Sequence, residues 1–475
     1  MQIVGILIAV YLLGSGLWQV LKPGRRLRAE EARLAKALAN SGNPASPPVC
    51  SPDQAARRLR RIRLGGVVRL AVVAAALTLW AGGASLGWQH GSEVSALEGE
   101  HADERTIVEG AGREFLREGR ASGLVVGAIS GTNHLLLAFG TTGVCGGKVT
   151  GETLWEIGSI TKVFTGVALA SEVESGRLEL DQPLRSLLPA EVPLPPGGEQ
   201  ITLGHLTSHT SGLPRLPQNM SALGLAKMVF VGGNPYASYS ESDFCEGLRL
   251  AKLHCKPGER PEYSNFGTGL LGWVLAKRNG VTYEEYIRRI VCEPLGMEST
   301  RIALGSTGQA NLAQGYRWIR KFGPFIVALR SRPWTLPNPF AGAGGLRSTG
   351  GDMLRFLNAN MHPEGWPIAG ALRKAQEERV REDEKTAIGM NWIRSRYAWC
   401  ECPVIWHNGG TGGYRSYLGF TEDGRAGVVV LSNSAQGVDE LGLRILQQLH
   451  EKAPEGDPLN SSDPPNGQPE PEPVN

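Results

Sequence analysis

The chain has 475 residues, of which 41% are hydrophobic and 20% are charged, with 63 glycines and 30 prolines. This composition is typical of a globular protein with many turns and room for two or three domain-sized units, and it excludes long internal repeats. The net charge of +3 is too small to indicate nucleic acid as a partner.

Two apolar runs near the N-terminus predict transmembrane helices, at residues 1–21 and 65–89. The first is uncharged from Ile3 to Val20, about the minimum length for a helix that crosses a hydrocarbon core. A cleaved signal peptide is the alternative, but signal peptides carry their positive charge before the apolar core, whereas here it follows. The second run is interrupted only by Arg69, whose long side chain can reach the membrane surface.

The segment between these runs, residues 22–64, contains eleven Lys/Arg and three acidic residues, a net charge of +8. A basic run of this kind can be a solvated or nucleic-acid-binding arm. Its place between two apolar runs favours a topology determinant, and the positive-inside rule then predicts a cytoplasmic linker. Everything after about Gln89 is therefore expected on the extracytoplasmic, periplasmic side of the cytoplasmic (inner) membrane.

A globular domain is predicted over residues 90–452, and it begins and ends with alternating, strand-like segments. The predicted strands are Leu124–Ile129, His134–Gly140, Ala387–Arg394, Tyr414–Phe420 and Gly427–Leu431. Helices are expected at Asp103–Arg120 and Val438–Leu449, and a mainly helical insertion at about residues 165–385. We predict an α/β fold of the α+β kind, with an antiparallel sheet made from both ends of the domain and flanked by helices. Residues 453–475 are predicted to be a disordered tail.

The stretch from Leu154 to Ala170 carries the first motif with chemical meaning. A strand-like run ends at Gly158, and Ser159 then opens a segment with helical periodicity in which Lys162 lies one turn later on the same face. A serine hydroxyl needs a neighbouring base to become a nucleophile. A lysine can be that base when desolvation or nearby cations lower its pKa. Taken alone, the pattern favours a serine N-cap followed by an ordinary helical lysine.

Two later motifs add candidate groups. In Tyr263-Ser264-Asn265, a tyrosine near a cationic lysine can have a lowered pKa and shuttle protons, and the asparagine amide can both donate to and accept from a substrate. In His407-Asn408-Gly409-Gly410, the bare glycine backbone allows a substrate to pair along a strand edge.

In this order, Ser159-x-x-Lys162, Tyr263-x-Asn265 and His407-x-Gly409 resemble the three active-site motifs of the class C β-lactamase and DD-peptidase superfamily of serine hydrolases. Flanking segments such as EIGSITKVFTG, YSNFGTGLLG and WHNGGTGGYRSYLGF are similar to members of that family. The resemblance covers roughly residues 102–450 and implies a β-lactamase/transpeptidase-like fold.

The resemblance also implies a role for each matched residue. Catalysis would rest on Ser159 as the acylated nucleophile, Lys162 as its base partner and Tyr263 as the proton relay to the leaving nitrogen. Substrate binding would rest on Asn265, which would hold the substrate amide, and on His407, Gly409 and Gly410 along the cleft. The backbone N–H groups of Ser159 and Gly410 would form the oxyanion hole. Whether Lys162 or Tyr263 is the base in acylation stays open.

His407 is the main departure from the class C β-lactamases, which have a lysine at this position. A permanent cation there helps to hold the carboxylate of a β-lactam, whereas a histidine is only partly charged at neutral pH. The resemblance therefore favours a membrane-anchored cell-wall peptidase that cleaves D-alanyl peptides through a serine acyl-enzyme. A β-lactamase proper or an esterase on the same scaffold are alternatives. A penicillin-binding sensor is a further one, although the linker is too short for a separate cytoplasmic effector domain.

No cofactor and no metal are predicted. His205 and His209 are four residues apart but lack the glutamate of the zinc-peptidase pattern, so a structural role is expected for both. Cys400-Glu401-Cys402 is a poor chelate by itself. Of seven cysteines, Cys50 falls in the predicted linker, and an even number remains in a compartment that permits disulfides. Cys245 with Cys255 is the candidate pair closest in sequence apart from the adjacent two.

Overall fold

The computed structural model describes residues 84–88, 94–97, 102–221, 224, 233–322 and 325–453. The predicted span at 1–21, the linker at 22–64, most of the second span and the tail lie outside the described residues. The last residues of the second predicted span, Ala84–Trp88, form strand β1 and do not continue a helix. None of the described helices combines the length and the apolar character needed to cross a bilayer.

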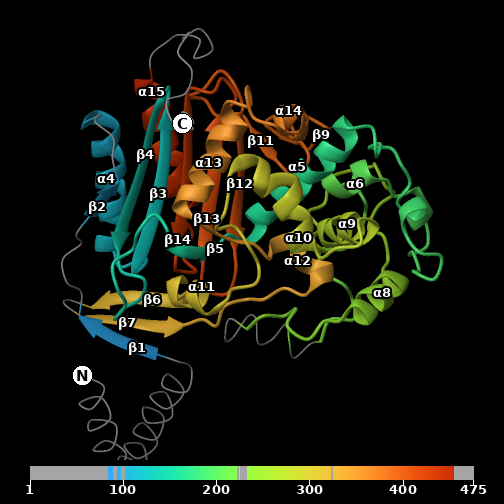
Figure 1. Cartoon of the computed structure of the whole chain (residues 1–475), viewed down its shortest axis with the longest axis horizontal. Helices are drawn as coiled ribbons and strands as arrows, with labels where there is room; N and C mark the ends of the chain where they lie inside the picture. The colour runs from blue at the N-terminus through green and yellow to red at the C-terminus, as the bar shows by residue number, and fades with distance from the viewer. Residues whose placement is uncertain are drawn as a thin grey trace, which may run out of the picture. The chain divides into compact units, whose positions relative to one another are not determined.

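A nine-stranded sheet forms the centre of the fold, in the order β2-β4-β3-β14-β13-β12-β11-β10-β9, with antiparallel neighbours throughout (Figure 1). Its strands are β2 (Val94–Leu97), β3 (Gly123–Ser130), β4 (Asn133–Gly140), β9 (Val380–Arg381), β10 (Thr386–Ile388), β11 (Ile393–Ser395), β12 (Val404–Gly410), β13 (Arg415–Thr421) and β14 (Ala426–Ser432). The pairing of β3 with β14 joins the beginning and the end of the predicted globular domain. The predicted antiparallel sheet from both ends is therefore confirmed.

Two details of the sheet differ from the prediction. The single strand expected at Ala387–Arg394 is a hairpin of β10 and β11, because Asn391 takes a positive φ of 64° and turns the chain between them. Strand β12 was not among the predicted strands, and it contains Gly409 and Gly410.

Both faces of the sheet are covered, which explains why every residue of β3 is buried. Helices α4 (Ala102–Arg117) and α15 (Asp439–Lys452) pack on one face, and α13 (Gly350–Met361) packs on the other. Accordingly, Val126 and Val430 belong to one apolar cluster, while Val125 and Leu431 belong to the other. Successive side chains of these two paired strands point to opposite faces of the sheet, so each strand contributes to two apolar cores.

Helices are the main regular structure of the predicted insertion, and most of them lie to the right of the sheet in Figure 1. Its elements are α5 (Thr161–Glu174), η2 (Leu184–Leu187), η3 (Gly198–Gln200), α6 (Leu203–Thr207), α8 (Glu241–Leu250), α9 (Asn265–Arg278), α10 (Tyr283–Ile287), η4 (Arg288–Cys292), η5 (Glu293–Leu295), α11 (Ser306–Asn311), α12 (Asn338–Gly344) and α14 (Ala369–Gln376). It also contains strands that the prediction missed. These are β6 (Tyr316–Phe322) and β7 (Phe325–Arg330), which pair beside β1, and β8 (Arg347–Thr349), which pairs with β5 (Leu154–Glu156).

Helix α5 is enclosed on almost every side. It packs against α9, α12 and α14, so that the apolar residues of nearly all its faces are buried. Phe164 stacks on Phe356 of α13 with ring centroids 4.1 Å apart. Gly166 brings α5 so close to the backbone of Met390 that a Cβ there would lie 2.1 Å from the carbonyl oxygen. A helix packed this closely holds its side chains in fixed positions.

The described cysteines, Cys145, Cys245, Cys255, Cys292, Cys400 and Cys402, all carry free thiols. The candidate pair Cys245 and Cys255 therefore forms no bridge in this structure. Cys245 packs against the main apolar core from α8, whereas the Sγ of Cys255 lies 4.0 Å from the carbonyl oxygen of Arg260. Proximity in sequence did not bring the two sulfur atoms together because α8 directs one of them inward.

Candidate active site

Ser159 lies in a short 3-10 turn, η1 (Gly158–Ile160), that connects β5 to α5. Gly158 has a φ of +50°, and a Cβ at this position would lie 2.5 Å from the backbone nitrogen of Gly410. Only glycine fits both the backbone conformation and the close approach. Ser159 is half-buried and so remains accessible, with the N–H of Gly410 on β12 beside its turn.

Lys162 places its amine next to the serine, as the spacing predicted. Its Nζ lies 3.0 Å from the Oγ of Ser159 and 2.5 Å from the carbonyl oxygen of Ala343 on α12. The side chain is completely buried, and this burial, with the charge of Arg215 second, holds the pKa of Lys162 well below its usual value. A lysine in this state is a neutral amine with a lone pair available for the serine proton.

Tyr263 completes the group around the serine, but its pKa moves in the direction opposite to that predicted. Burial raises the pKa of Tyr263 to about 12, and a hydrogen bond with Ser159 and the charge of Arg215 only partly oppose the rise. The predicted lowering assumed a cationic lysine, but burial lowers the pKa of Lys162 itself, and burial is also the main influence on the pKa of Tyr263. Tyr263 is therefore a protonated phenol in the resting site.

The Tyr263 ring is enclosed by side chains from several segments. The Nζ of Lys162 is 5.0 Å from its centroid and the Cζ of Arg215 is 4.9 Å away. The rings of His209 and His407 are 4.6 Å and 6.2 Å away, centroid to centroid. The phenol thus has a fixed orientation toward Ser159.

Asn265 begins α9, and its N-cap is Ser264, whose Oγ accepts a hydrogen bond from the N–H of Gly267 at 2.9 Å. The Asn265 Nδ2 donates to the hydroxyl of Tyr236 at 3.2 Å. The Oδ1 is buried and has no hydrogen-bond partner within the described part of the chain. A buried acceptor in this condition is suited to receive an N–H group from a ligand.

His407 is buried on β12, and its Nδ1 lies 2.6 Å from the carbonyl oxygen of Asn408. Burial, and then the amine of Lys162, lower the pKa of His407 to about 3. The ring is therefore neutral at pH 7, and the partial charge expected from the sequence is absent. Nδ1 donates to the carbonyl, which leaves Nε2 as a buried acceptor for which the described residues provide no partner.

The glycine end of β12 has two features, a close backbone contact at Gly409 and an unpaired edge. A Cβ on Gly409 would lie 2.0 Å from the carbonyl oxygen of Ile157, so this glycine allows β12 to pack against the segment that leads into Ser159. Strand β12 pairs with β11 only over Val404–Trp406. Beyond that point no described strand pairs with His407–Gly410 on the β11 side, and this part of β12 is a local edge that an extended substrate can join.

Several residues near the site were not predicted. Arg215 is exposed and reaches the Tyr263 ring from the loop after α6. It is far from the site motifs in the sequence, so no local pattern reveals it. Tyr236 comes from another loop and holds Asn265. Below the serine turn, Glu156 and Arg347 form a buried pair between β5 and β8, in which burial raises the pKa of Glu156 to about 7.

The structural interpretation of His205 and His209 is confirmed. The Nδ1 of His205 accepts the N–H of Thr202 in a capping box. His209 has a φ of 60°, and its Nδ1 accepts the N–H of Ser264 at 3.2 Å. His209 thus fixes the loop that carries Tyr263 and Asn265.

Residues 104–451 match the family model described as Beta-lactamase. A beta-lactamase of Yersinia enterocolitica is 24% identical over 369 residues, which cover 69% of this chain and 86% of that protein. The D-alanyl-D-alanine-carboxypeptidase/endopeptidase AmpH of Escherichia coli K12 is 24% identical over 345 residues, or 68% of this chain and 84% of that protein. The crystal structure of a beta-lactamase/D-alanine carboxypeptidase from Pseudomonas syringae superposes with a TM-score of 0.61 at 20% identity, covering 74% of this chain and 100% of that chain, which shows the same fold.

The buried neutral state of Lys162 predicts a specific dependence of stability on pH. Between its lowered folded pKa and the usual value of 10.5, Lys162 is neutral when folded and charged when unfolded. The unfolded state then binds one more proton than the folded state. The free energy of unfolding therefore increases as the pH rises. Wild type should gain about 1.4 kcal/mol of stability per pH unit relative to Lys162→Met across this range, measured by urea denaturation.

The exposed Lys252 provides the matched control. Lys252→Met should run parallel to wild type over the same pH range. Parallel curves for Lys162→Met and wild type would contradict a neutral Lys162.

Proposed function

Since the chain belongs to the beta-lactamase family of serine hydrolases, we propose that it hydrolyses D-alanyl peptides of the cell wall through an acyl-enzyme on Ser159. The observation that carries the proposal is the contact between the Ser159 Oγ and the Lys162 amine at 3.0 Å, in a site where burial keeps that amine neutral. A neutral amine at hydrogen-bond distance can accept the serine proton as the oxygen attacks a carbonyl.

In this mechanism Lys162 is the base of acylation, because Tyr263 with a pKa of about 12 keeps its own proton. The oxyanion that forms lies between the backbone N–H groups of Ser159 and Gly410, which are worth a few kcal/mol of transition-state stabilisation. As the tetrahedral intermediate collapses, Tyr263 gives its proton to the leaving nitrogen and recovers one from the Lys162 ammonium. Water then enters, and the same groups act in reverse to release the acid and the free serine.

Substrate recognition is proposed to rest on neutral acceptors inside the site and one cation at its rim. The free Oδ1 of Asn265 accepts a peptide N–H, and the unpaired edge of β12 beyond Trp406 aligns the substrate backbone. His407 is neutral and cannot pair with a carboxylate as a lysine would. Arg215 lies exposed over Tyr263 and supplies a permanent charge for the C-terminal carboxylate of a D-alanyl peptide.

The name of the AmpH relative, a carboxypeptidase/endopeptidase, supports a peptide substrate, and that of the Yersinia relative supports β-lactam hydrolysis. We favour the peptide because the acyl group of a D-alanyl substrate is extended and can use the β12 edge. β-Lactam hydrolysis, ester hydrolysis and a persistent acyl-enzyme, as in a penicillin-binding sensor, are separate outcomes of the substrate test below.

We also propose that the enzyme is anchored in the cytoplasmic membrane with its hydrolase domain in the periplasm. Support comes from the sequence alone: the apolar run at 1–21, the basic linker and the second run. With Ala84–Trp88 in β1, residues 65–83 remain for the second helix, about 19 residues, which is enough to span the hydrocarbon core. A reporter enzyme that is active only outside the cytoplasm, fused after Gln89, should be active. A silent reporter that is nevertheless expressed would reverse the orientation.

Loss of the nucleophile should abolish acylation. Ser159→Ala is expected to remove covalent labelling by a fluorescent penicillin and to lower turnover of a D-Ala-D-Ala peptide by at least about 10³-fold, because no acyl-enzyme can form. Nitrocefin and a short acyl ester, assayed beside the peptide, distinguish the substrate classes. Ser175→Ala, at an exposed serine on the same segment, should behave as wild type. Unchanged labelling of Ser159→Ala would exclude Ser159 as the nucleophile.

The role of Arg215 can be tested with a pair of peptides. Arg215→Gln should raise KM for a peptide with a free C-terminal carboxylate by roughly 10- to 100-fold, the value of one charge-assisted hydrogen bond. The amidated form of the same peptide should be affected much less. Arg249→Gln, an exposed arginine on α8, is the control. Equal effects of Arg215→Gln on both peptides would show that Arg215 acts through Lys162 and not on the carboxylate.

A further inference from the structure

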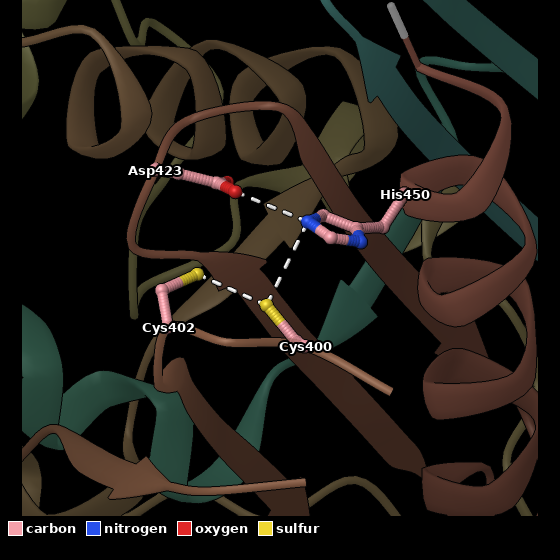
Figure 2. A group of neighbouring side chains, drawn as sticks. All are labelled: Cys400, Cys402, Asp423 and His450. Atoms are coloured by element: carbon pink, nitrogen blue, oxygen red, sulfur yellow. Dashed lines mark hydrogen bonds and ion pairs between the residues drawn. The ribbon is translucent and has the colours of Figure 1, made fainter. Parts of the chain in front are cut away.

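Four side chains that take no part in the proposed catalysis point toward one another at the surface end of the sheet (Figure 2). They are Cys400, Cys402, Asp423 and His450, and their ligand atoms all lie within 4.8 Å of one another. The two sulfur atoms are 3.0 Å apart. The Nε2 of His450 is 3.6 Å from the Sγ of Cys400 and 3.0 Å from the Oδ2 of Asp423.

These residues come from three separate parts of the fold. Cys400 and Cys402 lie in the turn between β11 and β12, Asp423 lies in the turn between β13 and β14, and His450 lies in the last turn of α15. Each element is held in place by other contacts. The Oδ1 of Asp423 accepts the N–H of Arg425 at 3.0 Å, which leaves Oδ2 for the cluster. The guanidinium of Arg425 in turn donates to the carbonyl oxygens of His450 and Ala453 at the end of α15.

The spacing of the atoms is close to that of a tetrahedral metal site. Around a zinc ion, bond lengths of about 2.3 Å to sulfur and about 2.0–2.1 Å to nitrogen and oxygen place two sulfurs about 3.8 Å apart, a sulfur and a nitrogen about 3.6 Å apart, and a nitrogen and an oxygen about 3.4 Å apart. The observed sulfur–nitrogen distance equals this value. The other two contacts need to open by less than about 1 Å, which side-chain rotation can supply.

The protein groups alone do not satisfy one another well. The Nε2 of His450 faces a carboxylate oxygen and a thiol, yet one ring nitrogen offers either one proton or one lone pair. Cys400 and His450 are largely buried, while about a third of the Asp423 side chain is exposed. A cation would share all four groups at once, and the exposed carboxylate provides a route of entry.

We propose that Cys400, Cys402, Asp423 and His450 bind one metal ion of the zinc class. Two thiolates select a soft or borderline cation, and imidazole and carboxylate complete a four-ligand set that leaves no open position. Such a site is structural. It lies before the start of β12, whose other end holds Gly410, so seven strand residues, about 20 Å, separate the two sites.

The bound ion would tie the C-terminal helix α15 to the β13–β14 turn and to the segment that leads into β12. Strand β12 carries His407, Gly409 and Gly410 into the active site at its other end, and β13 pairs with β12 along its whole length. Metal binding is therefore expected to raise the stability of the fold without supplying chemistry to the reaction. The local sequence Cys-Glu-Cys is a poor chelate by itself, and the fold adds the two missing ligands.

The test uses the full chain, purified in detergent with a phosphine reductant, without chelator and with any affinity tag removed. Elemental analysis should find about one zinc per chain. After removal of zinc, added Co²⁺ should give visible d–d bands and a thiolate-to-metal charge-transfer band, which report tetrahedral sulfur ligation. Chelation should lower the midpoint of thermal unfolding of wild type.

Variants test whether these four side chains, and not other cysteines of the chain, bind the metal. Cys400→Ser/Cys402→Ser should lose the zinc and the charge-transfer band, while the matched control Cys245→Ser/Cys255→Ser should retain both. If the first double variant does not fold, Asp423→Asn, which keeps the size of the side chain, should still shift the Co²⁺ spectrum. Zinc retained by Cys400→Ser/Cys402→Ser would overturn the proposal. A second preparation made without reductant that is metal-free, has an intact mass lower by two hydrogens and yields a peptide map with Cys400 bonded to Cys402 would also overturn it.

Discussion

The active site depends on one constraint, the complete burial of the Lys162 amine beside Ser159. An ammonium ion in that position would be too costly to desolvate, and the neighbouring charge of Arg215 adds to the cost, so the neutral amine is the stable form. The packing of α5 makes this possible, because neighbours on almost every side leave the lysine no path to solvent. The helix that packs into the core therefore also holds the residue proposed as the base.

Strands from the beginning and the end of the globular domain position the site together. Strand β3 pairs with β14, and β14 pairs with β13 and through it with β12, which brings Gly410 against the turn that holds Ser159. Two glycines are needed at this crossing. Gly158 supplies a positive φ and leaves room for the nitrogen of Gly410, and Gly409 leaves room for the carbonyl of Ile157. The position of the Gly410 N–H, which is proposed to bind the oxyanion, thus follows from a contact between backbones that side-chain movement cannot loosen.

Features that depend on residues close in the sequence could be predicted, and features that depend on distant residues could not. The contact between Ser159 and Lys162 comes from one helical turn, and the sheet from alternation in its strands, so both were found. The pKa of Tyr263 depends on Arg215 and on its burial by His209, which meet it only in the fold, and its direction was predicted wrongly. The strands β6, β7 and β8 lie in a region dominated by helical periodicity and were missed. The group around Cys400 was invisible for the same reason, since Asp423 and His450 come from distant elements.

The distribution of charge explains how a family scaffold can operate with a histidine where a lysine stands in the class C β-lactamases. Inside the site, burial neutralises Lys162 and His407 and keeps Tyr263 protonated, so proton transfer begins from uncharged partners. Among the described groups around the Tyr263 ring, Arg215 carries the permanent charge, and it is exposed at the rim. A cation there attracts an anionic substrate without being desolvated itself, and its field also lowers the pKa of Lys162. In the proposed mechanism, one arginine therefore couples recognition of the carboxylate to activation of the nucleophile. A lysine at the His407 position would be buried and would have to be charged to bind a carboxylate.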